Sequence, residues 1–276
     1  MNLDNVHIIT YSNRLDKLEH LQKSESIFNT NVEYIINDDW EGFHSKLIEV
    51  KKKISSFNDT DIVIFIDAWD VLINSNKSEI VSKFLSYNCD FLVSAELNPF
   101  PKHYHKKFRK LPDAQGKNIF INSGGYMGYV KNIKLFLEWK SIDEIKKICK
   151  VGGDQTYLVE YYLANHDKIS IKSDKKSLIF HSMYLVDWKD IEFREGRAYS
   201  LLFNTYPCFV HFNGGTWKAK EPQNNIMPVF NELLIKSKEN KDDKYNLNNA
   251  GKCEFPKNYF CTIHNKPDKY RTIRKL

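Results

Sequence analysis

Apolar residues in the first half of the chain follow two alternating patterns. Short runs rich in β-branched residues predict strands over residues 6–10, 32–36, 62–66 and 91–95. Between these runs, apolar residues recur at helical spacing over residues 15–28, 43–54 and 78–85. This β-α-β-α-β-α-β order predicts an open, doubly wound α/β sheet.

The third predicted strand, residues 62–66, is apolar at every position. Such a strand suits a parallel sheet whose two faces are both covered by helices. We therefore expect this strand at the centre of the sheet.

The second half of the chain is less regular. It predicts strands over residues 126–130, 169–171, 178–180 and 209–212, and helices over residues 133–139 and 155–164. Residues 236–252 are rich in Lys, Asn and Asp and predict an exposed loop or linker before a tail. The fold expected is thus a single Rossmann-like α/β domain with a central, mostly parallel twisted sheet flanked by helices.

Composition supports an ordered globule and narrows the classes of protein. The chain has 276 residues, of which 42% are hydrophobic and 14% aromatic, far from the composition of disordered chains. A net charge of +6 mildly favours anionic ligands. No nucleic-acid-binding signature accompanies it, so no nucleic-acid partner is expected.

The sequence pattern predicts neither a membrane span nor a signal peptide. No apolar run approaches the length of a membrane span, and residues 1–5 are polar rather than signal-peptide-like. We expect a soluble, cytoplasmic protein without an export signal of its own.

The cysteines match no zinc-binding spacing. Cys89, Cys149 and Cys208 lie among apolar residues and are interpreted as core residues. Cys253 and Cys261 lie close together in a polar tail, where a disulfide and two free thiols are both consistent with the sequence.

Asp67 and Asp70 follow the apolar run of residues 62–66. Open α/β sheets bind ligands outside the carboxyl ends of their strands, so these acids lie where a substrate is expected. Residues three apart on an extended strand point to opposite faces, and the chain must turn after Asp67 for the carboxylates to converge. Converging carboxylates suit Mg²⁺ or Mn²⁺ bridging a diphosphate. The alternative is a loop acid followed by a helix N-cap.

His211 follows the apolar run 208–210 and lies just before a glycine turn. Two carboxylates and one imidazole suit Mn²⁺ somewhat better than Mg²⁺. The alternative is a histidine that bonds its own turn.

Three further segments carry candidate binding residues. Residues 122–125, Asn-Ser-Gly-Gly, predict a loop suited to sugar hydroxyls or a plain turn. Asp154 follows two glycines and opens an apolar helix, where it is a candidate catalytic acid or simply the N-cap. Trp40, in an acidic loop, is a candidate stacking partner for a nucleobase or a cover for the core.

An ordered set of short stretches extends from about residue 6 to residue 220. The stretches are Ile8-Ile9-Thr10, Asp39-Trp40, Phe65-Ile66-Asp67-Ala68-Trp69-Asp70-Val71, Ser94-Ala95-Glu96, Asn122-Ser123-Gly124-Gly125-Tyr126-Met127-Gly128, Asp154-Gln155, Lys176-Ser177-Leu178-Ile179-Phe180 and His211-Phe212-Asn213-Gly214. Together they resemble the glycosyltransferase domain of the procollagen lysyl hydroxylase and glucosyltransferase family.

This resemblance implies a GT-A fold that binds a UDP-sugar donor and Mn²⁺, with Mg²⁺ as the alternative metal. Residues 1–232 would form the GT-A-like domain, with a nucleotide-binding half (1–120) and an acceptor half (121–232), and residues 233–276 a polar linker and tail. The implied roles are metal binding by Asp67, Asp70 and His211; donor binding by Thr10, Trp40, Lys46, Trp69, Asn213, Gly214 and Lys218; substrate binding by Glu96, Asn122, Ser123 and Gly124; and catalysis by Asp154 and Gln155.

The sequence also departs from the family pattern. Trp69 replaces the usual tyrosine, and residues 97–101, Leu-Asn-Pro-Phe-Pro, replace a cysteine and a tryptophan before proline, which alters the expected acceptor pocket. No length remains for a hydroxylase domain, so only sugar transfer is expected.

The function implied is transfer of a hexose, with glucose as the first choice and galactose as the alternative, from UDP-glucose or UDP-galactose to a hydroxyl acceptor with retention of configuration. The family suggests galactosyl-hydroxylysine of a collagen-like protein as the acceptor, with a glycan or a small molecule as alternatives. The alternative from another class is a catalytically inactive UDP-sugar or glycan-binding module.

Overall fold

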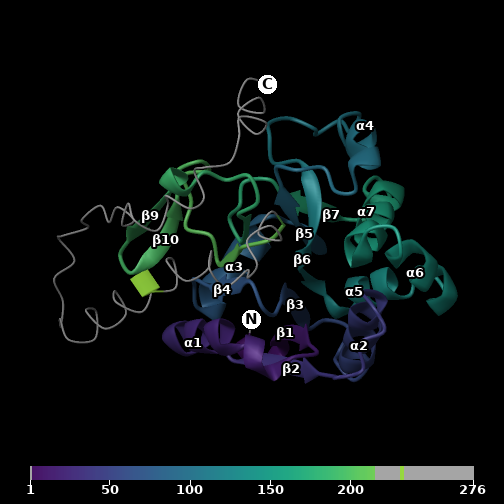
Figure 1. The fold of residues 1–276 in the computed structure, drawn as a ribbon, viewed down its shortest axis with the longest axis horizontal. Coiled ribbons are helices and arrows are strands. Elements are labelled where there is room, and N and C mark those ends of the chain that lie inside the picture. The colour runs from purple at the N-terminus through teal and green to yellow at the C-terminus, as the bar shows by residue number, and fades with distance from the viewer. Residues whose placement is uncertain (1, 215–230, 233–276) are drawn as a thin grey trace.

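The computed structural model describes residues 2–214 and 231–232 (Figure 1). Its main sheet has six strands in the order β2-β1-β3-β6-β5-β7. The strands are β1 (Val6–Ser12), β2 (Val32–Ile36), β3 (Ile62–Asp67), β5 (Phe91–Glu96), β6 (Phe120–Tyr129) and β7 (Ile171–Asp174). All pairings are parallel except the two made by β6, which runs antiparallel to β3 and β5. The predicted α/β class with a mostly parallel central sheet is confirmed, and β3 lies inside the sheet as expected.

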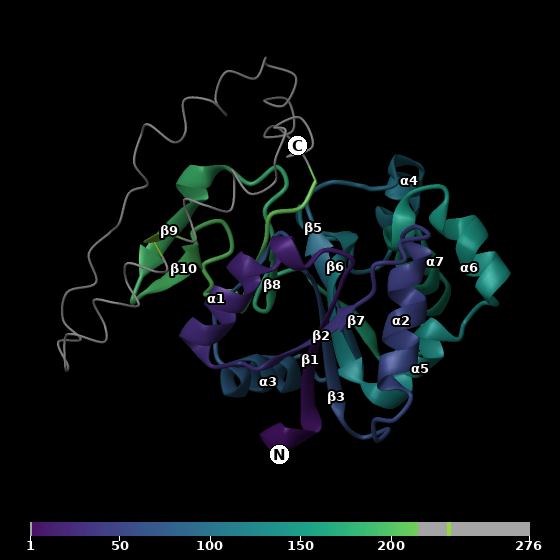
Figure 2. The same ribbon diagram turned by 60° about the horizontal axis from the view of Figure 1, so that its bottom comes forward.

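Helices cover both faces of this sheet (Figure 2). They are α1 (Glu19–Phe28), α2 (His44–Ile54), α3 (Lys77–Ser86), α4 (His105–Phe108), α5 (Val130–Leu137), α6 (Ile142–Cys149) and α7 (Gly153–Asn165). Sequence reasoning did not predict α6, although Ser141 gives it a capping box with Glu144.

Alternation along β3 separates two apolar cores. Val63 and Phe65 face a core built with α2, α5, α6 and α7, whereas Ile62, Ile64 and Ile66 face a core built with α1 and α3. This arrangement explains why the sequence of β3 is apolar at every position: both faces are covered.

A smaller sheet in the order β4-β11-β8 packs on the α1–α3 side. It comprises β4 (Val71–Ile73), β8 (Phe180–Ser182) and β11 (Phe209–His211), and the hairpin of β9 (Ile191–Arg194) and β10 (Arg197–Ser200) follows β8 in the chain. Single 3₁₀ turns precede β1 and α1 and occur at Lys102–Tyr104 and Trp188–Asp190. The strand β4, which follows Asp70 directly, was not predicted.

Residues 122–125 are a correction to the sequence prediction. They lie within β6 rather than in a loop. The register against β5 jumps from Val93–Tyr126 to Ser94–Asn122, so residues 123–125 bulge away from β5. The glycines are needed because a Cβ on Gly125 would lie 2.5 Å from Phe180.

Some sequence expectations fall outside the described residues. These are the roles of Lys218, Cys253 and Cys261, the linker 236–252 and the tail 233–276. Within the described part, Cys89, Cys149 and Cys208 are buried free thiols. Among the described helices, none is long and apolar enough to cross a membrane.

Candidate functional site

The candidate metal ligands come from two sheets that meet at the carboxyl end of β3. Asp67 is the last residue of β3, and the chain bends over residues 68–70, as convergence of the two carboxylates requires. His211 ends β11, opposite Val71 of β4, and the backbone N–H of Phe212 donates to the Asp70 carbonyl over 2.7 Å. Strand pairing therefore places His211 beside Asp70.

The three side chains form one group whose ligand atoms all lie within 4.8 Å of one another. The Nε2 atom of His211 is 3.3 Å from Asp70 Oδ1 and 3.6 Å from Asp67 Oδ2. Gly124 makes room for this group, since a Cβ there would lie 1.9 Å from His211 Cε1 and 2.8 Å from Asp67 Oδ2. Two hard oxygens and one imidazole at this separation fit a divalent cation such as Mn²⁺.

Asn122 orients the His211 ring. The Nδ1 atom of His211 is 3.1 Å from Asn122 Oδ1, which also accepts the Gly124 N–H. A proton on Nδ1 leaves the Nε2 lone pair directed at the carboxylates, which is the tautomer that binds a metal. Asn122 thus acts on the site through His211.

The electrostatics of this group reflect acids that are crowded together and partly buried. Burial raises the pKa of Asp67 above its usual range, and Lys46 and His211 offset this only in part. Burial would also raise the pKa of Asp70, but the nearby His211 lowers it overall. Burial alone would lower the pKa of His211, yet Asp70 and Asp67 raise it. The cluster therefore attracts positive charge strongly.

Lys46 joins the metal-ligand group to Asp154. Its Nζ atom, supplied by α2, is 2.7 Å from Asp67 Oδ1 and 2.7 Å from Asp154 Oδ2, and the lysine is 8% exposed. Burial would lower the pKa of Lys46, but the two carboxylates raise it well above its usual value, so the ammonium stays charged. The N-cap of α7 is Gly152, so the interpretation of Asp154 as an N-cap is wrong.

Gln155 is held in a closed network. Its Nε2 donates to Glu96 Oε1 over 2.6 Å and to the carbonyls of Ile121 and Phe100. Its Oε1 accepts from Asn122 Nδ2 over 3.3 Å. Since both the oxygen and the nitrogen of the amide are hydrogen-bonded, Gln155 holds α7 in position against β5 and β6.

Glu96 ties the same network to the strand that carries His211. Its second oxygen accepts from Asn213 Nδ2 over 2.8 Å, and Asn213 Oδ1 accepts the Tyr184 N–H. Burial raises the pKa of Glu96 to about 7, although the hydrogen bonds from Gln155 and Asn213 oppose that shift. Gly214, next in the chain, has φ +79° and packs against Tyr184.

Three aromatic side chains lie beside the group formed by Lys46, Asp67, Asp70, Asp154 and His211, which we call the Lys46 site. Trp40 is 42% exposed and packs edge-on against Phe43, and Trp69 is 37% exposed with its Nε1–H donating to Ser12 Oγ over 2.9 Å. Phe43, which sequence reasoning missed, lies against Gly153, where a Cβ would be 3.1 Å from its ring. In the sequence, Phe43 is marked only as an aromatic residue at the start of a predicted helix.

Two predicted site residues are placed differently from the rest. Thr10 is fully buried, and its hydroxyl donates to the Ile66 carbonyl over 2.8 Å. Ser123 contributes its backbone N–H toward Gln155 Oε1 at 3.5 Å. Neither hydroxyl is directed into the metal-ligand group by a described contact.

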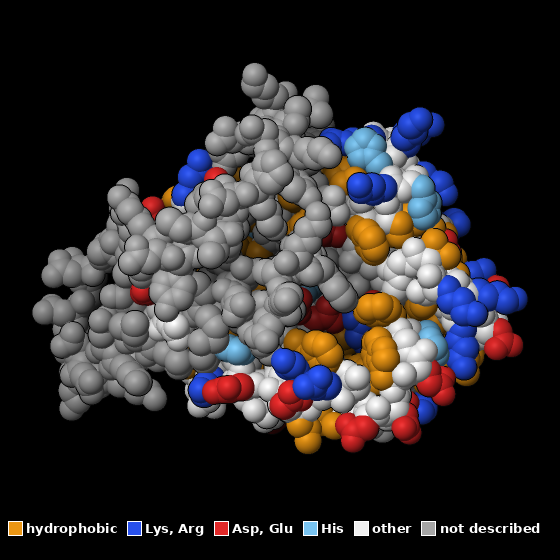
Figure 3. Space-filling view, in the orientation of Figure 1, with side chains coloured by type: hydrophobic (Ala, Val, Ile, Leu, Met, Phe, Trp, Pro, Cys, Tyr) orange, Lys and Arg blue, Asp and Glu red, His pale blue; other side chains and the backbone are white. Residues whose placement is uncertain are grey.

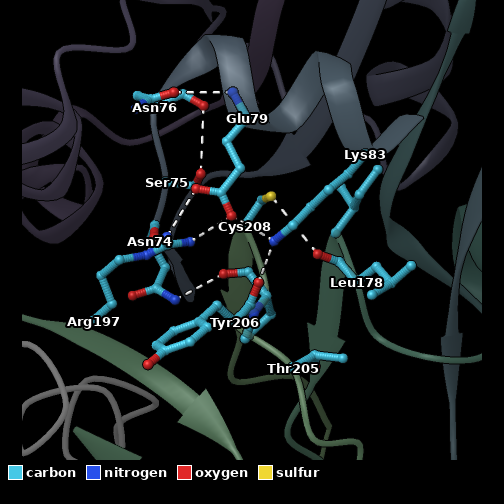
Figure 4. Close-up of polar contacts among 12 residues, drawn as sticks. Asn74, Ser75, Asn76, Glu79, Lys83, Leu178, Arg197, Thr205, Tyr206 and Cys208 are labelled. Carbon is cyan, nitrogen blue, oxygen red and sulfur yellow. Dashed lines mark hydrogen bonds and ion pairs between the residues drawn. The ribbon is translucent and has the colours of Figure 1, made fainter. Parts of the chain in front are cut away.

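A polar cluster behind the small sheet anchors the strand that ends at His211 (Figure 4). The Asn74 amide donates to the carbonyls of Ala198 and Pro207 over 2.9 and 2.7 Å and accepts the Ala198 N–H over 2.8 Å. Arg197 forms a bidentate pair with Glu79 at 2.8 and 2.9 Å, and Lys83 also pairs with Glu79. These contacts fix β4, α3 and the β9–β10 hairpin against one another.

Comparisons with known proteins show the family of the chain. Residues 2–230 match the family model described as the PLOD GT domain. Procollagen-lysine,2-oxoglutarate 5-dioxygenase 1 of Gallus gallus is 26% identical over 82% of this chain and 32% of that protein. The human multifunctional procollagen lysine hydroxylase and glycosyltransferase LH3 is 26% identical over 75% of this chain and 29% of that protein. The chain spans about a third of the length of these curated relatives.

Solved glycosyltransferase structures are also similar, at lower identity. A galactosyltransferase, LgtC, in complex with donor and acceptor sugar analogs aligns with a TM-score of 0.48 at 14% identity, over 82% of this chain and 94% of that one. A glycosyltransferase involved in glycosylation of the major capsid of PBCV-1 aligns with a TM-score of 0.46 at 15% identity, over 80% of this chain and 98% of that one. On the match that covers most of its length, this chain belongs to the PLOD GT domain family of glycosyltransferases.

Proposed function

We propose that the chain transfers a hexose, glucose in the first instance, from a UDP-sugar to a hydroxyl acceptor with retention of configuration. The observation that carries this proposal is the convergence of Asp67, Asp70 and His211 beside the buried Lys46–Asp154 pair. Family membership supports sugar transfer as the reaction.

Asp67, Asp70 and His211 would hold the divalent cation. When bound, that cation would neutralise the charge that builds on the UDP diphosphate as the glycosidic bond breaks. Asn122 keeps His211 in the ligating tautomer, and Lys46 holds Asp67 in place from the opposite side.

Asp154 would act on the sugar itself. Its carboxylate is fixed by Lys46 at the start of α7, and a negative charge near the anomeric carbon stabilises an oxocarbenium-like transition state. Trp40 and Trp69 would flank the uracil, with Asn213, Gly214 and Lys218 near the diphosphate. The substrate-binding set is Glu96, Asn122, Ser123 and Gly124, of which Glu96 and Asn122 act mainly through their neighbours.

The acceptor proposed from the relatives is a hydroxyl of a glycosylated, collagen-like protein. The names of the relatives describe lysine hydroxylation and glycosylation of procollagen.

A panel of UDP-sugars, with and without Mn²⁺ and read as released UDP, tests the proposal. UDP release should require Mn²⁺ and should be fastest with UDP-glucose. If the protein binds UDP with Mn²⁺ but releases UDP from none of the donors, it is a UDP-sugar-binding module and not an enzyme.

A further inference from the structure

A basic surface lies on the segment that joins β5 to β6. Between Glu96 and Asp113 the chain carries no acidic residue. Every exposed side chain from residue 102 to residue 110 is basic. Figure 3 shows blue and pale blue side chains gathered over the face that carries α4. The exposed residues, which we call the α4 surface, are Lys102, His103, His105, Lys106, Lys107, Arg109 and Lys110.

Two aromatic side chains anchor this segment to the domain. Tyr104 is 6% exposed, and its hydroxyl donates to Glu160 of α7. Phe108 is 2% exposed and packs edge-on against Phe120 of β6, with 5.7 Å between the ring centroids. The backbone under the exposed cations is therefore already fixed, so that a partner binds without the cost of ordering it.

The cations of the α4 surface have no acidic partner in the part of the chain that the structure describes. Lys107 lies over the Tyr104 ring and Arg109 over the Phe120 ring, and no ion pair forms at either cation or at the other three lysines. Asp113, the first acid after the segment, pairs with Lys175 instead. The positive charge is thus not neutralised locally, and it attracts an anionic partner.

The α4 surface offers hydrogen-bond donors with few acceptors. Residues 102–110 include no Asp, Glu, Asn, Gln, Ser or Thr, and the hydroxyl of Tyr104 is already bonded to Glu160. Ammonium and guanidinium groups donate hydrogen bonds and accept none. Sugar hydroxyls both donate and accept, so a glycan would leave donor protons without partners here. Carboxylates only accept, and they match this surface.

Phosphate groups also only accept, but the α4 surface lacks the other features of a nucleic-acid site. The helix α4 spans four residues, too short to read a DNA groove, and Tyr104 and Phe108 are buried, so neither can stack on a base. Arg109, the one arginine of the segment, lies over Phe120, and its Nη1 donates to the Gly116 carbonyl over 3.5 Å. The surface therefore favours the carboxylates of a polypeptide.

We propose that the α4 surface binds an acidic segment of a polypeptide and that this polypeptide is the acceptor of the transferred sugar. The acceptor role rests on the proposed function. Pro101, which directly precedes Lys102, contacts the start of α7, since a Cβ on Gly152 would lie 2.8 Å from Pro101 Cγ. Asp154 follows Gly152 by two residues. A polypeptide on the α4 surface thus needs only a few more residues to reach Asp154.

Fluorescence anisotropy on the full chain, without UDP or metal, measures the binding. The probes are a labelled oligoglutamate and a labelled oligoglutamine of the same length, which differ in charge. We expect the oligoglutamate to bind at least about tenfold more tightly, and its affinity to fall as salt is added. Equal affinities for the two probes would overturn the proposal.

Charge reversals locate the site. Lys106→Glu and Lys110→Glu should each weaken oligoglutamate binding about threefold and together at least about tenfold, with little change in melting temperature because neither side chain contacts a described residue. Lys131→Glu, the same charge change at an exposed position of α5, should leave the affinity unchanged. An equal loss in Lys131→Glu would show that only net charge matters and would overturn the site.

A nucleic-acid probe tests the choice of partner. The probe is a labelled single-stranded oligodeoxynucleotide with the same number of charges as the oligoglutamate. We expect it to bind no more tightly than the oligoglutamate. Tighter binding that is lost in the Lys106→Glu/Lys110→Glu variant would overturn the choice of a polypeptide.

Released UDP separates this inference from the proposed function. If the oligoglutamate binds as expected but no UDP-sugar is turned over, the proposed function and the acceptor role fail and the binding surface stands. If acceptor-free UDP release is normal but Lys106→Glu/Lys110→Glu keeps its affinity for the oligoglutamate, the surface fails and the proposed function stands.

Where both hold, two galactosyl-hydroxylysine peptides, one flanked by glutamates and one by glutamines, test the acceptor role. The peptide with glutamates should have the lower KM, and Lys106→Glu/Lys110→Glu should remove that difference and leave acceptor-free UDP release unchanged. A difference in KM that persists in this variant, or transfer to neither peptide, would overturn the acceptor role.

Discussion

The Lys46 site and the cluster around Asn74 are both polar, but they differ in how fully their hydrogen-bonding and charged groups are satisfied. In the Asn74 cluster, carbonyls, amides and ion pairs are matched at hydrogen-bonding distance. In the Lys46 site, Asp67, Asp70 and Asp154 converge on the cationic Lys46 and on His211.

This difference separates structure from function. A matched buried cluster stabilises the fold and needs nothing further. Converging carboxylates at a strand end repel one another and are stabilised by an added cation, which is the property of a binding site. The predictions below test the contrast by changing one group at a time.

The largest effect is expected from Asp154→Asn, which removes the carboxylate that we propose acts on the sugar and keeps the shape of the side chain. We expect UDP release and sugar transfer to fall about 10³-fold, the order found for loss of a charged catalytic group. The affinity for UDP with Mn²⁺ should stay near that of the parent, and the melting temperature is measured as a control because Asp154 also pairs with the buried Lys46. Steady-state rates measure this, and a variant as active as the parent would reduce Asp154 to a structural partner of Lys46.

In the other cluster, Asn74→Ala should affect stability instead. It strands two carbonyls and one N–H in a buried site, and we expect the free energy of unfolding to fall by about 3 kcal/mol. Urea unfolding measures the change. A loss of turnover without a loss of stability would show that the two clusters are not separate in function.

Glu96 and Glu79 should respond to pH in opposite directions. Burial raises the pKa of Glu96 to about 7, so the folded protein binds an extra proton between pH 4.5 and 7 and loses stability as the pH rises through that window. Burial would raise the pKa of Glu79 as well, but Arg197 and Lys83 lower it to about 2, so its stabilisation is present above pH 4.5 and is lost as the pH falls toward 2.

Urea unfolding at several pH values, with Glu96→Gln and Glu79→Gln as matched variants, reads both slopes. Relative to Glu96→Gln, the parent should lose about 3 kcal/mol from pH 4.5 to 8. Relative to Glu79→Gln, it should lose stability on acidification. Slopes of the same sign would contradict the contrast between the two clusters.

A smaller effect is expected from the two exposed tryptophans beside the Lys46 site. Trp40→Ala and Trp69→Ala should each weaken UDP binding about tenfold, because a flat base loses an aromatic contact. Trp139→Phe is the control, since Trp139 packs on Tyr157 and Tyr161 in the core. If neither Trp40→Ala nor Trp69→Ala changes the affinity for UDP, the base binds elsewhere.

Several residues of the Lys46 site could be predicted because the sequence patterns that mark them are local. The apolar strand before Asp67 and the short strand before His211 place both residues at strand ends. Their convergence depends on the bend at residues 68–70 and on the pairing of β11 with β4, which the sequence leaves open.

Long-range contacts account for what the sequence missed. The Asn74 cluster joins residues more than a hundred positions apart, and Gln155 meets Glu96 across two strands. Residues 122–125 were predicted as a loop because glycines usually mark turns, whereas here they make room for His211 and Phe180 within β6.

The most direct test of the account is the affinity for UDP, measured by calorimetry with Mn²⁺ and then with EDTA. Asp67 and Asp70 would repel the diphosphate without a cation, and Lys46 already pairs with Asp67 and Asp154. We predict that UDP binds well with Mn²⁺ and only weakly with EDTA. Asp67→Ala or Asp70→Ala should remove most of the metal-dependent part, and His211→Ala a smaller share. Equal affinity with Mn²⁺ and with EDTA would contradict the account.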